Sequence, residues 1–271
     1  MPELPEVETT CRGIEPHLVN QRIDRVVVRD ARLRWRVPKA LATELPGQRI
    51  RAVARRAKYL LLTADTGTVI LHLGMSGRLR VLDATEPPAK HDHIDIVLTN
   101  GRCLRLRDPR RFGAVLWTQG APAEHKLLAN LGPEPLEAGF SGEYLHRITR
   151  GRKRAVRDVL LDSSVVAGVG NIYANEALFG AGIRPTRAAG SLSAAECERL
   201  VRAVRATLKR AIRAGGTTFR DYRRSDGQPG YFQLSLKVYG RDGERCRTCR
   251  APIRLQRLGQ RSTFYCRRCQ R

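Results

Sequence analysis

Four cysteines near the C-terminus have the spacing of a metal site. They form two Cys-x2-Cys pairs, Cys246 with Cys249 and Cys266 with Cys269, and 16 residues separate the pairs. Each pair supplies two thiolates from one tight turn, and two pairs complete a tetrahedron around one Zn²⁺ ion. Four protein ligands leave no open position for a substrate. The sequence therefore predicts one structural zinc, and two disulfides or four free thiols are poorer alternatives.

The N-terminus offers a second kind of chemistry. Pro2 is small enough for Met1 to be removed, which would leave a free secondary amine beside Glu3. Such an amine can attack an electrophilic sugar carbon, and the resulting iminium acts as an electron sink. A frayed end is the commoner fate of a Met-Pro start, so these residues alone leave both interpretations open.

Two further segments contain groups suited to phosphate. The loop between the cysteine pairs contains Arg254, Arg257 and Arg261, and basic residues on a metal-clamped hairpin can grip phosphates. The segment Gly168-Val169-Gly170-Asn171 precedes a helical pattern, so its backbone N–H groups could face a phosphate. A solvated charged face and a tight packing turn are the respective alternatives.

The composition points to a polyanionic partner. The chain has 271 residues, 50 Lys and Arg against 26 Asp and Glu, and a formal net charge of +24. An excess of this size attracts polyanions, of which nucleic acid is the commonest. The apolar runs are shorter than the ~20 residues of a membrane span, and the acidic, Pro-broken start lacks the features of a signal peptide. We therefore expect no membrane insertion and no secretion, and the clustered cysteines fit a reducing cytoplasm.

The elements that must position these residues begin with strands. Short β-branched runs separated by turn motifs predict strands in the first 120 residues, and their spacing favours a sandwich or barrel. The runs lie at 26–28, 49–53, 69–73, 93–98 and 102–107. A helix is expected before them, at about 7–19.

Helical patterns follow the segment Leu131–Leu136, which breaks every periodicity and is the expected linker. Ser193-Ala194-Ala195-Glu196 is a capping box, and apolar residues at helical spacing follow it until Gly215-Gly216. Shorter helices are expected at about 153–161 and 172–181.

Distinctive motifs run in order along the whole chain. They are MPELPEVET at 1–9, RAKYL at 56–60, HLGMSG at 72–77, KHDH at 90–93, DPRRFG at 108–113, LGPEPL at 131–136, GVGNIY at 168–173, SDGQPGYF at 225–232 and the four cysteines. Together they resemble the motifs of the bacterial formamidopyrimidine-DNA glycosylase family, whose members are base-excision repair enzymes.

The resemblance implies an α+β fold with several parts. An N-terminal β-sandwich catalytic domain would occupy 1–130 and a linker 131–150. A helical DNA-binding domain with a helix–two-turns–helix motif would follow over 151–240, and a zinc finger over 241–271. DNA would lie in the cleft between the domains.

The implied activity is removal of oxidised purines from double-stranded DNA, chiefly 8-oxoguanine opposite cytosine and formamidopyrimidines, followed by β,δ-elimination. Pro2 would attack C1′ of a nucleotide flipped out of the duplex and form a Schiff base, while Glu3 would protonate the sugar ring oxygen. Lys58 would donate a proton in β-elimination and Arg261 in δ-elimination. Because a guanidinium hardly deprotonates, phosphate clamping is the physically easier role for Arg261.

The resemblance also implies DNA contacts. Met75, Arg110 and Phe112 would fill the space left by the flipped base, as an apolar wedge, a guanidinium facing the orphaned cytosine and a stacking ring. The remaining contacts would be His72, His91, Arg152 and Asn171. The loop at about 217–231 would surround the damaged base. By residue type alone, Met75 and Phe112 are more often core residues.

Two other functions are open to the sequence. Charge and cysteines alone permit a non-catalytic zinc-finger DNA-binding protein, and covalent chemistry at Pro2 would distinguish an enzyme from it. An endonuclease VIII-like glycosylase for oxidised pyrimidines shares the Pro-Glu start and the zinc finger. The residues LPEVE at 4–8, Met75 and the pair Arg110 and Phe112 favour the oxidised-purine enzyme. Nothing in the sequence points to an oligomer, so we expect a monomer.

Overall fold

The structure, a computed structural model, describes residues 2–217 and 235–271. The described chain forms two compact units. One unit contains residues 2–129 and 214–217, and the other contains 130–213 and 235–271. The SDGQPGYF motif, and all of the expected damaged-base loop after residue 217, lie outside the described residues.

The first unit contains two four-stranded antiparallel sheets, with strand orders β1-β6-β7-β5 and β2-β3-β4-β8. The strands are β1 Ile23–Val28, β2 Ala52–Arg56, β3 Tyr59–Thr63, β4 Thr68–His72, β5 Arg78–Asp83, β6 Asp92–Leu98, β7 Arg102–Arg107 and β8 Ala114–Thr118. One apolar core includes alternate residues of both sheets, such as Leu60 and Leu62 of β3 and Ile94 and Ile96 of β6. The predicted sandwich is confirmed.

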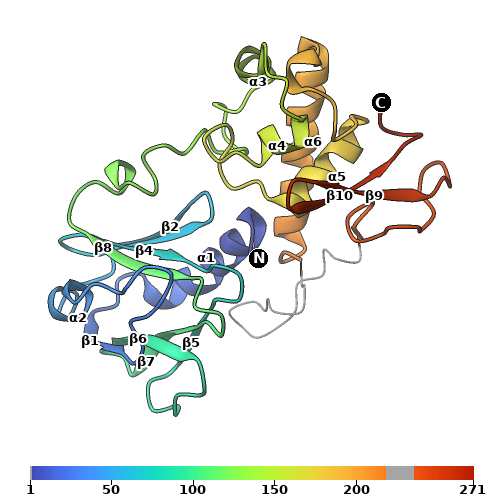
Figure 1. The fold of residues 1–271 in the computed structure, drawn as a ribbon. Helices are drawn as coiled ribbons and strands as arrows, with labels where there is room; N and C mark the ends of the chain where they lie inside the picture. The colour runs from blue at the N-terminus through green and yellow to red at the C-terminus, as the bar shows by residue number, and fades with distance from the viewer. Residues whose placement is uncertain (1, 218–234) are drawn as a thin grey trace. The chain divides into compact units, whose positions relative to one another are not determined.

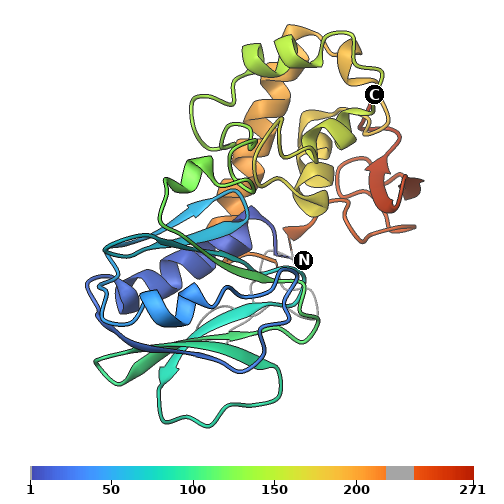
Figure 2. The same cartoon turned by 60° about the vertical axis from the view of Figure 1, so that its left-hand side comes forward.

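Two helices lie along the open sides of this sandwich (Figures 1 and 2). Helix α1 (Leu4–Leu18) contacts the edge strands β2 and β5, and α2 (Ala40–Glu44) contacts the opposite edge strands β1 and β8. Helix α1 buries Val7, Cys11, Ile14 and Leu18 in the core at helical spacing. The sandwich therefore fixes the helix that begins two residues after Pro2. A short 3-10 turn, η1 (Pro122–Glu124), follows the last strand.

The structure adds β3, β5 and β8 to the five predicted strands. In β3 the residues Leu60, Leu61 and Leu62 are all apolar, so the sequence shows no alternation. Burial nevertheless alternates, with Leu60 and Leu62 buried and Leu61 half-buried. The pattern missed these strands because apolar residues also occupy partly exposed positions of the sheet.

The second unit is helical and ends in a hairpin. Its elements are α3 Gly142–Thr149, α4 Val156–Leu160, α5 Asn171–Ala181, the 3-10 turn η2 Ala189–Ser191, α6 Ala194–Arg213, β9 Ile253–Leu258 and β10 Arg261–Cys266. Helix α6 packs against α3 and α5, and β10 packs against α5. The capping box is confirmed, because Ser193 Oγ accepts from the Glu196 N–H and Glu196 Oε2 accepts from the Ser193 N–H.

The segment predicted as a linker, 131–150, contains α3. Ser141 caps this helix, because its Oγ accepts from the Tyr144 N–H at 3.0 Å. The Pro- and Gly-rich residues at 131–136 precede the helix and obscured it, although Ser141 itself is a favourable cap. The domain boundaries stay a prediction.

Candidate functional site

Helix α1 holds the predicted nucleophile and acid at its N-terminus. Pro2 precedes Glu3, which caps the helix, and both residues are buried. The Glu3 N–H donates to Glu6 Oε2 at 2.8 Å, and the Thr217 N–H donates to Glu6 Oε1 at 2.7 Å. The buried Glu6 carboxylate therefore fixes the backbone beside Pro2 and ties it to residue 217. Glu6 was not among the predicted site residues, although its spacing from Glu3 is that of a capping box.

Lys58 lies in the tight turn between β2 and β3. Ala57 precedes it with a φ of 54°, in the left-handed region, and is buried. Arg55 joins this turn to α1, because its Nε donates to Glu8 Oε2 at 2.8 Å and its Nη1 donates to the Ala57 carbonyl at 3.0 Å. The nearly buried ion pair therefore holds the turn that contains Lys58 against the helix that begins at the predicted acid.

His72, at the end of β4, is neutral. Its ring centre lies 4.9 Å from that of Tyr59, its cross-strand partner. Burial and the charges of Lys58 and Arg34 lower the pKa of His72 to about 4. Because His72 Nδ1 accepts from the Gly74 N–H at 3.0 Å, the ring proton is on Nε2. A neutral Nε2–H can donate one hydrogen bond to a phosphate oxygen.

Met75, Arg110 and Phe112 project from two neighbouring loops of the first unit. Met75 is 37 % exposed and Phe112 is 45 % exposed, so neither is a core residue. The Arg110 guanidinium carbon lies 4.8 Å from the centre of the Phe112 ring, which is a cation–π contact. The structure therefore places a guanidinium, a ring and a thioether on the surface of one unit.

The other two surface candidates occupy turns. His91 is half-buried and has a φ of 76°, which few residues other than glycine adopt. Arg152 is exposed in the turn after α3, where its N–H donates to the Thr149 carbonyl and its carbonyl accepts from the Gly190 N–H. The backbone hydrogen bonds hold this turn and leave the Arg152 side chain in solvent.

In the second unit, the half-buried Asn171 and the buried Arg157 tie the β9–β10 hairpin to the helices. Asn171 Nδ2 donates to the Ser262 carbonyl at 2.8 Å, and Arg157 Nη2 donates to the Leu258 carbonyl at 2.9 Å. Arg261 lies between these two anchored positions and is exposed. Asn171 therefore uses its side-chain amide to hold the hairpin that presents Arg261.

The chain before the hairpin is anchored by a carboxylate. Glu176 of α5 is 2 % exposed and accepts from three consecutive backbone N–H groups, those of Lys237, Val238 and Tyr239, each at 2.9 Å. On the same helix, Asn175 Oδ1 accepts from the N–H of Phe264 at 2.7 Å. Neither residue was predicted, because their partners are backbone groups.

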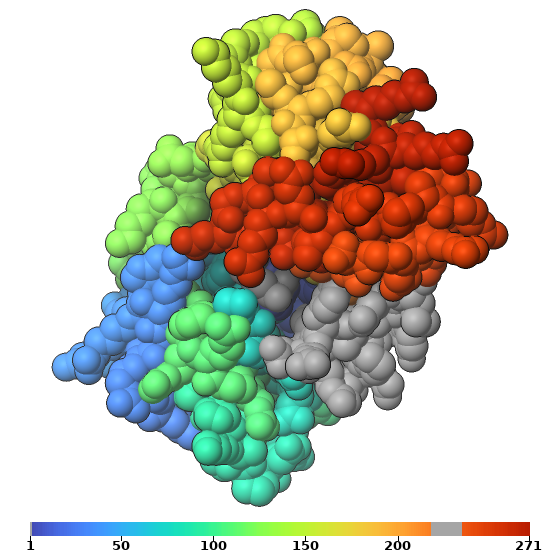
Figure 3. Space-filling view, turned by 45° about the vertical axis from the view of Figure 1, so that its right-hand side comes forward, coloured from blue at the N-terminus to red at the C-terminus, as the bar shows by residue number. Residues whose placement is uncertain are grey.

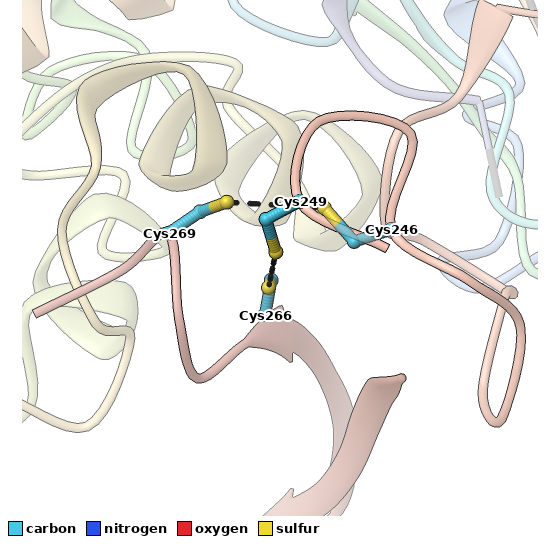
Figure 4. Close-up of side chains that lie close together, drawn as sticks. All are labelled: Cys246, Cys249, Cys266 and Cys269. Atoms are coloured by element: carbon cyan, nitrogen blue, oxygen red, sulfur yellow. Dashed lines mark hydrogen bonds between the residues drawn. The ribbon is translucent and has the colours of Figure 1, made fainter. Parts of the chain in front are cut away.

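The four cysteines converge as a metal site requires (Figure 4). Their sulfur atoms all lie within 4.8 Å of one another, with Cys246 Sγ 3.9 Å from Cys269 Sγ and Cys249 Sγ 3.4 Å from Cys266 Sγ. Zn–S bonds of ~2.3 Å in a tetrahedron place sulfurs about 3.8 Å apart, so the donor set fits one structural zinc. Burial raises the pKa of Cys246, but the backbone N–H groups of Cys249 and Thr248 outweigh it and lower that pKa to about 7.

The surface of the C-terminal segment is strongly basic. Arg254, Arg257 and Arg261 are all exposed on the hairpin. Figure 3 shows the C-terminal segment, coloured orange to red, at the surface on the face in view.

Among the described residues, no helix combines the length and apolarity needed to cross a bilayer.

Family models match three successive parts of the chain. The formamidopyrimidine-DNA glycosylase N-terminal domain matches residues 1–115, and the H2TH domain of the same glycosylase matches 131–223. The zinc finger found in FPG and IleRS matches 243–271.

Relatives match over the full length. The chain is 60 % identical over 271 residues to the formamidopyrimidine-DNA glycosylase of Stutzerimonas stutzeri and 57 % identical to that of Pseudomonas aeruginosa strain UCBPP-PA14, covering 100 % of each chain. The MutM (FPG) protein from Thermus thermophilus superposes with a TM-score of 0.89 at 40 % identity, over 99 % of this chain and 98 % of that one. Lactococcus lactis Fpg in complex with DNA containing an abasic site superposes with a TM-score of 0.92 at 32 % identity, over 99 % of each chain.

Proposed function

Since the chain belongs to the formamidopyrimidine-DNA glycosylase family, we propose that it is a DNA glycosylase and abasic-site lyase of base-excision repair that removes oxidised purines from double-stranded DNA. The observation that carries this function is the match of all three family models in order, with 60 % identity to a relative over the full length. The Lactococcus lactis relatives were solved with abasic-site DNA and with Fapy-dG-containing DNA. These matches do not favour an endonuclease VIII-like enzyme or a non-catalytic binder.

The reaction starts at Pro2. After Met1 is removed, the secondary amine attacks C1′ of the flipped nucleotide, the bond from C1′ to the base breaks, and an iminium forms. Glu3 protonates the sugar ring oxygen as the ring opens, and its place at the helix cap supports this role.

Elimination then removes the phosphates on both sides of the sugar. We assign the proton donor of β-elimination to Lys58, whose turn is joined to α1 through Arg55. Arg261 clamps the phosphate that leaves in δ-elimination. Its exposed position on the anchored hairpin supports clamping, and a guanidinium keeps its proton.

The DNA contacts come from both units. Met75, Arg110 and Phe112 fill the space that the flipped nucleotide leaves, and their exposure on neighbouring loops supports this role. The proposed phosphate contacts are His72, His91, Arg152 and Asn171. Because the Asn171 side chain is used on the hairpin, its contact comes from its backbone N–H, which lies in the first turn of α5 and has no intrahelical partner.

One chain contains the nucleophile, the proposed contacts and the zinc ligands, so we propose that the enzyme acts as a monomer. The zinc thiolates suit the reducing cytoplasm. The functional divisions of the chain are a catalytic sandwich at 1–130, a connection at 131–150, a DNA-binding region at 151–240 and a zinc finger at 241–271.

Borohydride trapping tests the proposed chemistry. The zinc-loaded enzyme is mixed with a duplex that contains 8-oxoguanine opposite cytosine, the iminium is reduced, and the adduct is mapped by mass spectrometry. We expect the adduct on Pro2. An adduct on another residue, or tight binding without an adduct, would contradict the proposal, and the same trap with an oxidised pyrimidine would test the substrate class.

Two matched variants of α1 separate the acid from the nucleophile. Glu3→Gln should lose excision of 8-oxoguanine but keep trapping on a preformed abasic site, where no base has to leave. Glu15→Gln changes an exposed carboxylate of the same helix and should keep both activities. If Glu3→Gln excised 8-oxoguanine as fast as Glu15→Gln, the proposed acid role of Glu3 would be contradicted.

A further inference from the structure

We propose that Asp108, acting partly through Ser76, is the positioning residue for the loops that present Met75, Arg110 and Phe112. The inference rests on the proposed function, because it assigns these three side chains to the opening of the duplex. Asp108 itself does not touch DNA in this proposal. It sets the geometry of the groups that do.

The Asp108 side chain links the two loops directly. It is 0 % exposed, and its Oδ1 accepts from Ser76 Oγ at 2.6 Å while its Oδ2 accepts from the Gly113 N–H at 2.7 Å. Ser76 follows Met75 in the chain, and Gly113 follows Phe112. Each oxygen of one buried carboxylate is therefore bonded one residue away from an exposed side chain.

Ser76 extends the link to the third side chain. Its Oγ donates to Asp108 and also accepts from the Arg110 N–H at 3.2 Å, so one hydroxyl is used in both directions. Ser76 is 5 % exposed, which keeps water from replacing either partner. A buried donor that loses its acceptor is left without a hydrogen bond, so these bonds disfavour other loop conformations.

The backbone of Asp108 connects a third segment. Its N–H donates to the His91 carbonyl at 3.0 Å, and its carbonyl accepts from His93 Nε2 at 2.9 Å. A carbonyl only accepts, so the His93 proton is on Nε2. Asp108 thus joins the turn that contains His91 to the two loops already described.

The backbones of the two loops approach each other closely at two glycines. Gly74 has a φ of 61°, and a Cβ at this position would lie 2.3 Å from the carbonyl carbon of Phe112. A Cβ on Gly113 would lie 2.9 Å from Asp108 Oδ2. The glycines allow this approach, and the carboxylate determines the separation. Displacements of ~1 Å in positioning groups can cost a factor of about 100 in rate, so the link matters for catalysis.

Ser76→Ala is the sharpest test, because it removes one hydroxyl and leaves Asp108 with its bond to Gly113. We expect excision from a duplex with 8-oxoguanine opposite cytosine to fall about tenfold, as loss of one buried hydrogen bond predicts. Trapping on a single-stranded abasic oligonucleotide should stay within about twofold of the wild type, since that substrate has no base pair to open. Thr149→Ala is the matched control. It deletes a buried hydroxyl that donates to the Leu145 carbonyl at 2.8 Å in the other unit and should leave both rates unchanged.

A second comparison tests whether Ser76 acts through the loops. In a Met75→Ala, Arg110→Ala, Phe112→Ala background, the further change Ser76→Ala should alter duplex excision by less than about twofold, because the three side chains it positions are gone. Equal losses on both substrates, or a tenfold loss that persists in this background, would overturn the proposal. Asp108→Asn, which keeps the shape of the side chain but leaves only one oxygen acceptor, should be impaired on the duplex in the same selective way.

Amide hydrogen exchange gives a readout that does not depend on activity. In Ser76→Ala the Arg110 amide should exchange faster than in the wild type, and the amides of β3 should not change. Unchanged exchange at Arg110 would overturn the positioning role. Failure of the wild type to trap on abasic DNA would overturn the proposed function instead, and the exchange result would still decide the role of Asp108.

Discussion

The surroundings of His72 decide its chemistry. Burial disfavours the charged form of this histidine, and the nearby charges of Lys58 and Arg34 disfavour it further, so its pKa falls to about 4. The bond from the Gly74 N–H then selects the tautomer. The ring next to the predicted proton donor is therefore a neutral hydrogen-bond donor at physiological pH and adds no positive charge to the site.

A histidine NMR titration checks this assignment. We expect the His72 ring to stay neutral, with its proton on Nε2, from pH 8 to about pH 5. Because its native pKa lies below the ~6.5 of an unfolded chain, the unfolded state binds more protons between these values. The contribution of His72 to stability should therefore fall as the pH falls from about 6.5 to 4. A His72→Asn spectrum identifies the resonance, and a midpoint near 6.5 would contradict the assignment.

The C-terminal element depends on polar anchors and metal more than on apolar packing. Among the described residues, the buried members of its small core are Val238, Cys246, Ile253 and Cys266. Zinc binding of ~10–16 kcal/mol orders segments of this size, and the Glu176 carboxylate docks the preceding backbone on α5. The hairpin is thus held by contacts at its base and by the packing of β10 on α5, while most of β9 and the Arg261 side chain stay exposed.

Cys249→Ser should disorder the hairpin and weaken DNA binding at least tenfold, because three thiolates hold zinc poorly and the Arg261 turn loses its support. Zinc content and binding to a lesion-containing duplex measure the two effects. Cys197→Ser alters a buried cysteine of α6 outside the metal site and serves as the control. If the affinity of Cys249→Ser for DNA were unchanged, the hairpin would not be part of the DNA interface.

Glu176→Gln should destabilise the same element without touching the metal. An amide cannot accept from three N–H groups and presents its own N–H₂ to them, so we expect a loss of roughly 1–3 kcal/mol in the free energy of unfolding and faster zinc release to a chelator. Urea denaturation and a chelator assay measure these quantities. Glu143→Gln, at an exposed carboxylate of α3, should behave like the wild type, and equal behaviour of both variants would refute the docking role.

Across the whole molecule, the net charge of +24 governs the encounter with DNA. Each phosphate contact releases condensed counterions, so the logarithm of the binding constant should fall with the logarithm of salt concentration at a slope of roughly −4 or steeper. Arg257→Gln on the exposed hairpin should reduce the slope by about 1. Arg25→Gln, at an exposed arginine paired with Asp24, should not reduce it. Fluorescence anisotropy over a salt series measures both, and a flat response would contradict the polyanion interpretation.

The sequence by itself determined the features that depend on nearby residues. Two Cys-x2-Cys turns need no distant partner to form half of a zinc site each, and the capping box at Ser193 and Glu196 is complete within four residues. The series of motifs along the full length was enough to predict the family and the α+β fold class. The strand β3 was not predicted, because its sequence does not alternate between apolar and polar residues.

Only the tertiary structure decided which residues hold the site in place. Glu6 meets the Thr217 N–H across 211 positions, and Asp108 meets Ser76 across 32. Glu176 likewise binds backbone groups about 60 positions away. Every residue except proline has a backbone N–H group. The residue type of the donor therefore does not reveal which segment a buried carboxylate such as Glu6 or Glu176 will bind. The residue type determines what chemistry a side chain can do. Its position depends on contacts that exist only after the chain has folded.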